Sequence, residues 1–136
     1  MRYILISSVY LFIFSVCVSF IGASLNTASA GEALDGRTFS VELIETGQNE
    51  TAKDELIFKD GTFFSTECEQ YGFTPAKYES KSKDGVILFK SALTSGKEGK
   101  TEWEGAVTGD EITGTMFWTK EGQEPIIYTY KGAIKK

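Results

Sequence analysis

The chain has 136 residues with 14 Lys and Arg, 19 Asp and Glu, two cysteines and no histidine. Its length suits one domain, and its net charge of −5 argues against nucleic acid or an anionic membrane as partner, because clustered Lys and Arg recognise both. Without histidine there is no Ser-His-Asp triad, no Cys-His pair and no imidazole metal site. We therefore expect a protein that is not an enzyme and has no catalytic residues, metal or cofactor.

Residues 1–30 have the pattern of a secretory signal peptide. Arg2 is their only charge, residues 3–23 are predominantly apolar, and Ala28-Ser29-Ala30 has the small-x-small form of a cleavage site. We expect cleavage after Ala30 and export of residues 31–136 as one periplasmic or secreted domain with a net charge of −6. The alternative is an uncleaved anchor, because the apolar run approaches the ~20 residues that span a bilayer. After cleavage we expect no membrane association.

The rest of the chain alternates between apolar and polar side chains, as half-buried β-strands do. Within one of these segments, Asp60-Gly61 favours the positive φ angles of a tight hairpin. The alternating segments are 38–45, 54–66 (a hairpin), 76–82, 85–93, 100–109, 110–120 and 124–136. Their even spacing predicts an all-β fold, either a single antiparallel eight-stranded up-and-down barrel or a strongly curled meander. Closure into a barrel would remove the exposed strand edges.

After the third strand the pattern changes to that of a short helix at about residues 66–71. Thr66 and Glu69 have the spacing of a capping box, and Gly72 stands where a C-terminal glycine cap is expected. We expect this helix to lie across one mouth of the barrel as a lid. Cys68 and Tyr71, three residues apart, would share its barrel-facing side.

Cys68 is the only cysteine after the leader, and three interpretations of it are open. The first is a buried thiol that packs under the lid. The second is a disulfide that links two chains of an otherwise monomeric protein, since an odd cysteine in an exported protein can pair between molecules. The third is a reactive nucleophile, which Glu67 and Glu69 disfavour because negative charge opposes thiolate formation.

Large side chains gather at the inward positions of the predicted strands. An eight-stranded barrel is just wide enough either to be filled by side chains or to hold one small ligand. So many rings favour a filled interior, but buried hydroxyl and indole N–H groups need partners that a ligand could supply. The interior candidates for ligand binding are Tyr78, Phe89, Trp103, Met116, Trp118, Tyr128 and Tyr130.

The stretch Trp103–Thr115, "WEGAVTGDEITGT", with the export signal and the eight-strand pattern, resembles the small lipocalin-like (calycin-type) barrels of exported bacterial proteins. The Gly-x-Trp signature of lipocalins is absent, since Gly36 and Phe39 stand at a different spacing. The resemblance implies a barrel that holds a ligand, so we expect first the binding of a small apolar or aromatic molecule. The alternative is an inhibitor or interaction module whose acidic surface binds a basic protein partner such as a hydrolase.

Overall fold

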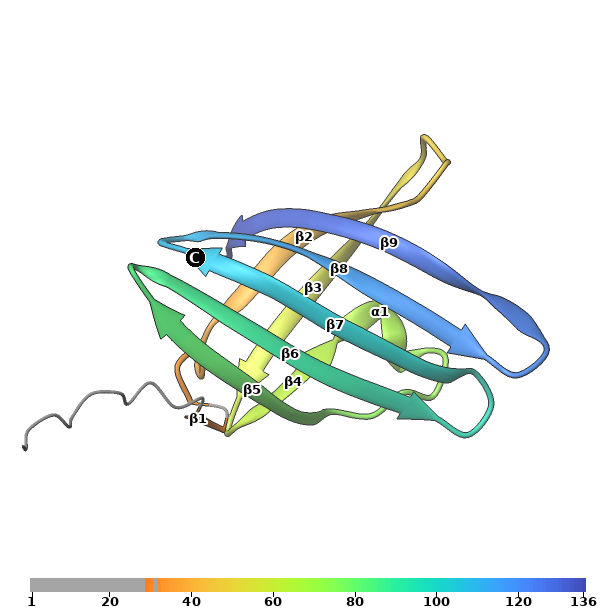
Figure 1. Cartoon of the computed structure of the whole chain (residues 1–136), viewed down its shortest axis with the longest axis horizontal. Helices are drawn as coiled ribbons and strands as arrows, with labels where there is room; N and C mark the ends of the chain where they lie inside the picture. Colours follow the sequence, from red (N-terminus) through yellow and green to blue (C-terminus); the bar gives the residue numbers. More distant parts are fainter. Residues whose placement is uncertain (1–28, 31) are drawn as a thin grey trace, which may run out of the picture.

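The computed structural model describes Ser29, Ala30 and residues 32–136 (Figure 1). The predicted leader therefore lies outside the described residues, apart from Ser29–Ala30, which form strand β1 and pair with strand β5 (Ala76–Lys83). Cleavage after Ala30 would remove β1 and leave every other strand uncut. Among the described residues no helix is long and apolar enough to cross a membrane.

Strands β2 to β9 form one closed antiparallel barrel (Figure 1). Each strand pairs with the next in the chain, and β9 returns to pair with β2, where Val41 lies opposite Gly132. This confirms the predicted all-β, eight-stranded up-and-down barrel. The strands are β2 (Thr38–Glu45), β3 (Thr51–Lys59), β4 (Thr62–Ser65), β5, β6 (Val86–Ser95), β7 (Gly99–Thr108), β8 (Glu111–Lys120) and β9 (Gln123–Ile134).

Two of the hairpin turns have the backbone conformation that their Asp-Gly sequences favour. Asp60 and Gly61, between β3 and β4, have φ angles of 51° and 78°, and Asp84 and Gly85, between β5 and β6, have 51° and 82°. Two successive positive φ angles belong to the type I′ turn, whose twist matches that of the flanking strands. The prediction of a hairpin at Asp60-Gly61 is confirmed.

A turn before β2 plugs one end of the barrel. Leu34 is completely buried there, and its backbone N–H donates to the Tyr78 hydroxyl at 3.0 Å. The Tyr78 hydroxyl in turn donates to Asp35 Oδ1 at 2.8 Å, and Asp35 also accepts from the N–H of Gly61 at 3.0 Å. The chain leading into the barrel therefore seals the end that carries the β3–β4 turn.

Aromatic rings fill the middle of the barrel. Neighbouring rings have centroids 4.9 to 6.0 Å apart, in the edge-on and tilted arrangements that aromatic pairs prefer. The connected rings are Phe39, Phe58, Phe63, Tyr78, Phe89, Trp103 and Tyr130. Over this part of its length the interior is packed with side chains.

Tyr130 explains why two strands carry glycine at inward positions. A Cβ atom added to Gly105 or Gly114 would overlap the Tyr130 side chain. The ring therefore packs directly on the backbone of β7 and β8, and its hydroxyl donates to the carbonyl of Glu104 at 2.9 Å. These glycines make room for a ring instead of loosening the strands.

Helix α1 (Thr66–Glu69) lies toward the other end of the barrel, the end from which the β6–β7 and β8–β9 turns project (Figure 1). Strand β4 pairs with β5 at only two positions, Thr62–Lys77 and Phe63–Ala76. Beyond these pairs the two strands separate, and the chain from 66 to 75 crosses this mouth. The prediction of a short helix after the third strand is confirmed, although it is shorter than 66–71.

The caps of α1 differ in part from the prediction. The N-cap is Ser65, whose hydroxyl accepts from the Cys68 N–H at 3.3 Å. Thr66 was expected to cap the helix, but its hydroxyl donates to a carboxylate on β3 instead. At the C-terminal end the cap residue is Gln70 and not Gly72. Gly72 lies two residues beyond it, with a φ of 85° and an N–H that bonds to the Glu69 carbonyl at 3.0 Å.

The lid prediction holds for Cys68 and fails in part for Tyr71. Cys68 is 7% exposed, whereas Tyr71 is 55% exposed. The helix ends at Glu69, so the spacing that would place residues three apart on one face does not extend to Tyr71. Tyr71 therefore stands at the edge of the mouth and is not packed beneath the lid.

Candidate functional site

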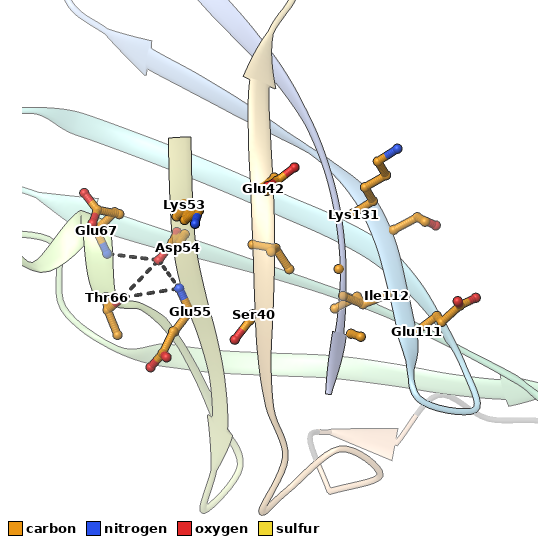
Figure 2. Close-up of a pocket in the computed structure, with 14 residues that line it drawn as sticks. Ser40, Glu42, Lys53, Asp54, Glu55, Thr66, Glu67, Glu111, Ile112 and Lys131 are labelled. Atoms are coloured by element: carbon orange, nitrogen blue, oxygen red, sulfur yellow. Dashed lines mark hydrogen bonds between the residues drawn. The ribbon is translucent and has the colours of Figure 1, made fainter. Parts of the chain in front are cut away.

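Two of the hollows in the described part of the chain are candidates for the functional site. The first is an open surface. Figure 2 shows this hollow on the outer face of β3, β2, β9 and β8. Charges of opposite sign face each other across the strands there, with Glu42 opposite both Lys53 on β3 and Lys131 on β9. Cross-strand pairs of this kind are typical of a solvated sheet face. We therefore regard this hollow as ordinary barrel surface.

The second hollow is a cavity of about 260 Å³ between α1 and the mouth of the barrel. Its walls come from five strands and from the lid segment, so it is enclosed on more sides than the outer hollow. Most of its large lining side chains are aromatic. The large side chains are Tyr71, Phe73, Trp103, Met116, Trp118 and Tyr128, and all of these except Met116 are aromatic. The lining side chains that carry polar groups, apart from the two indoles, are Asp54, Glu67, Cys68, Thr101, Tyr71 and Tyr128.

Asp54 fastens the lid to the barrel wall. It is 5% exposed, at an inward position of β3. Its Oδ1 accepts from the backbone N–H groups of Glu55 at 2.7 Å and Glu67 at 3.0 Å, and from the Thr66 hydroxyl at 3.1 Å (Figure 2). Its Oδ2 accepts from the Ser65 hydroxyl.

All four groups around Asp54 act as donors, which is the environment of an ionised carboxylate. Burial raises the pKa of Asp54, and these hydrogen bonds act in the opposite direction. Asp54 is therefore a buried carboxyl group whose pKa is raised by burial and whose four hydrogen-bond partners are neutral. It lies in the wall of the cavity.

The Cys68 thiol is buried and free. Burial, and to a smaller extent the charge of Asp54, raise its pKa from 9.0 to about 11, although a hydrogen bond with Ser65 opposes them. At neutral pH the group is a protonated thiol, which is a poor nucleophile. Of the three interpretations, the structure supports a thiol packed beneath the lid.

The buried N–H and hydroxyl groups of the rings have partners inside the protein. The indole N–H of Trp103 donates to the Thr101 hydroxyl at 2.9 Å, and that of Trp118 donates to the Glu98 carbonyl at 2.6 Å. The hydroxyls of Tyr78 and Tyr130 are likewise bonded to Asp35 and Glu104. The hypothesis that a ligand could supply these partners is therefore not needed for these four groups. The aromatic rings offer the cavity their carbon surfaces.

The structure divides the sequence-predicted candidates into two groups. Trp103, Met116, Trp118 and Tyr128 line the cavity together with the lid residues Cys68 and Tyr71. The other three interior candidates, Tyr78, Phe89 and Tyr130, do not line it. They belong to the packed core, where each is at most 3% exposed.

Six residues that line the cavity were not among the predicted candidates: Leu43, Ala52, Asp54, Glu67, Phe73 and Thr101. Asp54 stands two residues before Leu56 and four before Phe58, both of which are buried on the inner face of β3. A charged residue at an inward position of a strand needs a partner inside the barrel. That break in the alternation could have identified Asp54. Phe73 lies in the segment after the helix, where no periodicity predicts its burial.

The fold and the cavity together define a closed antiparallel barrel with a covered mouth lined by aromatic rings and carboxylates. Comparison with protein-family models, with curated proteins and with solved structures gave no match. Among the described residues no cluster of acidic or cysteine side chains is arranged to hold a metal ion.

Proposed function

We propose that this protein is an exported binding protein that holds a small apolar or aromatic molecule in the mouth cavity beneath α1. The observation that carries the proposal is the contrast between the two parts of the interior. The middle of the barrel is filled by contacting rings, whereas the mouth retains a partly open space with largely aromatic walls. The signal-like leader supports the export part, and the lack of histidine supports binding without catalysis.

The size of the cavity suits a single small molecule. Its volume is about 260 Å³, and an engineered apolar cavity of about 150 Å³ is known to bind benzene. One aromatic ring with a short substituent therefore fits. Larger ligands would have to displace Tyr71, whose exposed side chain stands at the rim.

The test is a titration of the folded protein with small aromatic compounds, followed by tryptophan fluorescence. The chain has two tryptophans, and both line the cavity, so each one reports on its occupation. We expect saturable changes in emission for ligands of about one ring.

A filling variant and a matched control sharpen this test. Ala52 on β3 lines the cavity, so Ala52→Leu should reduce its volume and weaken binding. Ala92→Leu makes the same change at an exposed position of β6 outside the cavity and should leave binding unchanged. Equal loss of binding in both variants, or no response of the wild type to any compound, would contradict the proposal. Capture of a basic hydrolase at low salt by the unresponsive protein would favour the alternative inhibitor function.

A further inference from the structure

We propose that the ligand of the mouth cavity is an organic cation, an ammonium group carried by a small aromatic or apolar body. This inference rests on the proposed function and specifies the chemical class of its ligand. It follows from three features of the same cavity: the absence of Lys and Arg from its described wall, the buried carboxyl group of Asp54, which has no basic partner among the described residues, and the aromatic side chains in its wall.

The charge in the cavity wall is entirely negative. Asp54 and Glu67 line the cavity, and among the described residues that line it none is Lys or Arg. Near the rim, Lys120 is bound at 2.9 Å to the carboxylate of Glu98, so its charge is already matched. An anion placed in this cavity would meet only like charges, whereas a cation would be attracted.

Asp54 is a buried carboxyl group without a basic partner among the described residues. It is 5% exposed, and its four hydrogen-bond donors are neutral backbone and hydroxyl groups. In the described part of the chain no Lys or Arg forms an ion pair with it. A buried charge is normally balanced by an opposite one. A cationic ligand in the adjacent cavity would provide that balance.

The aromatic side chains favour the same ligand. The indole N–H groups of Trp103 and Trp118 are bound within the protein, so neither offers a free donor to a ligand. Trp103 is 1% exposed, so the accessible aromatic surface of the cavity belongs mainly to the partly buried Trp118 and Tyr128 and to the exposed Tyr71. The face of an aromatic ring is electron-rich and attracts ammonium groups, and tryptophan does so most strongly. Several rings around a carboxylate thus bind a cation better than a neutral molecule of equal size.

The test compares three ligands that share a phenyl ring and a short tail but differ in charge: 2-phenylethylammonium, 2-phenylethanol and phenylacetate. Binding to the full chain is measured by isothermal titration calorimetry at neutral pH and low salt. We expect the ammonium compound to bind at least tenfold more tightly than the alcohol, and phenylacetate to bind most weakly. A tenfold difference corresponds to about 1.4 kcal/mol.

Charge variants on α1 show whether the cavity carboxylates cause the preference. Glu67 lines the cavity, whereas Glu69, also exposed and on the same helix, does not. Glu67→Gln should weaken binding of the ammonium compound about threefold and leave the alcohol unchanged, and Glu69→Gln should change neither. Asp54→Asn should have the larger effect, and its circular dichroism spectrum shows whether the barrel has folded. If Asp54→Asn does not fold, the comparison of Glu67→Gln with Glu69→Gln still tests the proposal.

The outcomes separate the two proposals. If the alcohol or phenylacetate binds as tightly as the ammonium compound, the cation inference is wrong but the cavity remains a binding site. The same conclusion follows if Glu67→Gln and Glu69→Gln behave alike. If none of the three ligands binds, both the inference and the proposed function are refuted.

Discussion

Replacing Cys68 by alanine should destabilise the protein at neutral pH and stabilise it at alkaline pH. The thiol is 7% exposed and packs in the core cluster. Cys68→Ala removes one buried sulfur atom, and truncations of this size lower the free energy of unfolding by about 1 kcal/mol. Because the thiol is free, we expect no change in oligomeric state.

The alkaline effect follows from the ionisation of the thiol. Burial raises its pKa from 9.0 to about 11, so on raising the pH the unfolded chain ionises first. The stability that the neutral thiol contributes is therefore complete below pH 9 and is lost as the pH rises through 11. At about pH 10.5 the wild type should have lost about 2 kcal/mol from this group. The alanine variant has no thiol to ionise, so it does not lose this part of the free energy of unfolding. At this pH it should therefore be more stable than the wild type by about 1 kcal/mol.

Urea denaturation followed by tryptophan fluorescence at pH 7 and pH 10.5 measures both differences. Val107→Ala is the control, because Val107 is 1% exposed and does not titrate. Its destabilisation should be the same at both pH values. A Cys68→Ala difference that does not change with pH would refute the buried thiol. Rapid labelling of the native wild type with Ellman's reagent, or a dimer on a non-reducing gel, would also refute it.

Two pairs of variants test the packing around the mouth and the core. Ser65→Ala should destabilise the protein by about 1–3 kcal/mol because its hydroxyl bonds Asp54. Ser80→Ala should be neutral or stabilising in the same urea denaturation, because the Ser80 hydroxyl is buried with no partner among the described residues. Trp103→Ala should cost about 3–5 kcal/mol because its ring is 1% exposed. Trp118→Ala should cost less, since Trp118 is only partly buried, and equal losses would contradict this difference.

Local sequence patterns predicted most of the barrel. Alternation identified the strands, and Asp60-Gly61 identified a hairpin, because both depend on neighbouring residues only. The pairing of β2 with β9, with Phe39 opposite Ile134, joins distant parts of the chain. Its register depends on how the whole sheet curls, so the sequence allowed either a closed barrel or an open meander.

Alternation along a strand predicts which side chains point into the barrel, but it does not predict how far along the barrel axis they lie. The candidate site was therefore predictable only in part. Tyr128 and Tyr130 share an inward face of β9, yet Tyr128 lines the mouth and Tyr130 lies in the packed core. The glycines opposite Tyr130 admit its ring, and this contact cannot be read from β9 alone. The plug at Leu34 was missed for a related reason: the turn has no periodicity, and its partner Tyr78 is distant in sequence.

The attachment of the lid has a kinetic consequence. Between Ser65 and Phe73 the lid is held by hydrogen bonds to Asp54, by the Ser95 hydroxyl, which donates to the Tyr71 carbonyl at 2.8 Å, and by the packing of Cys68 and Phe73 in the core. Opening it breaks these bonds but none of the ladders between the barrel strands. Amide hydrogens of this segment should therefore exchange with deuterium faster than those of β6 to β8. Local opening of this segment would then set the residence time of a bound molecule, while the barrel strands stay paired.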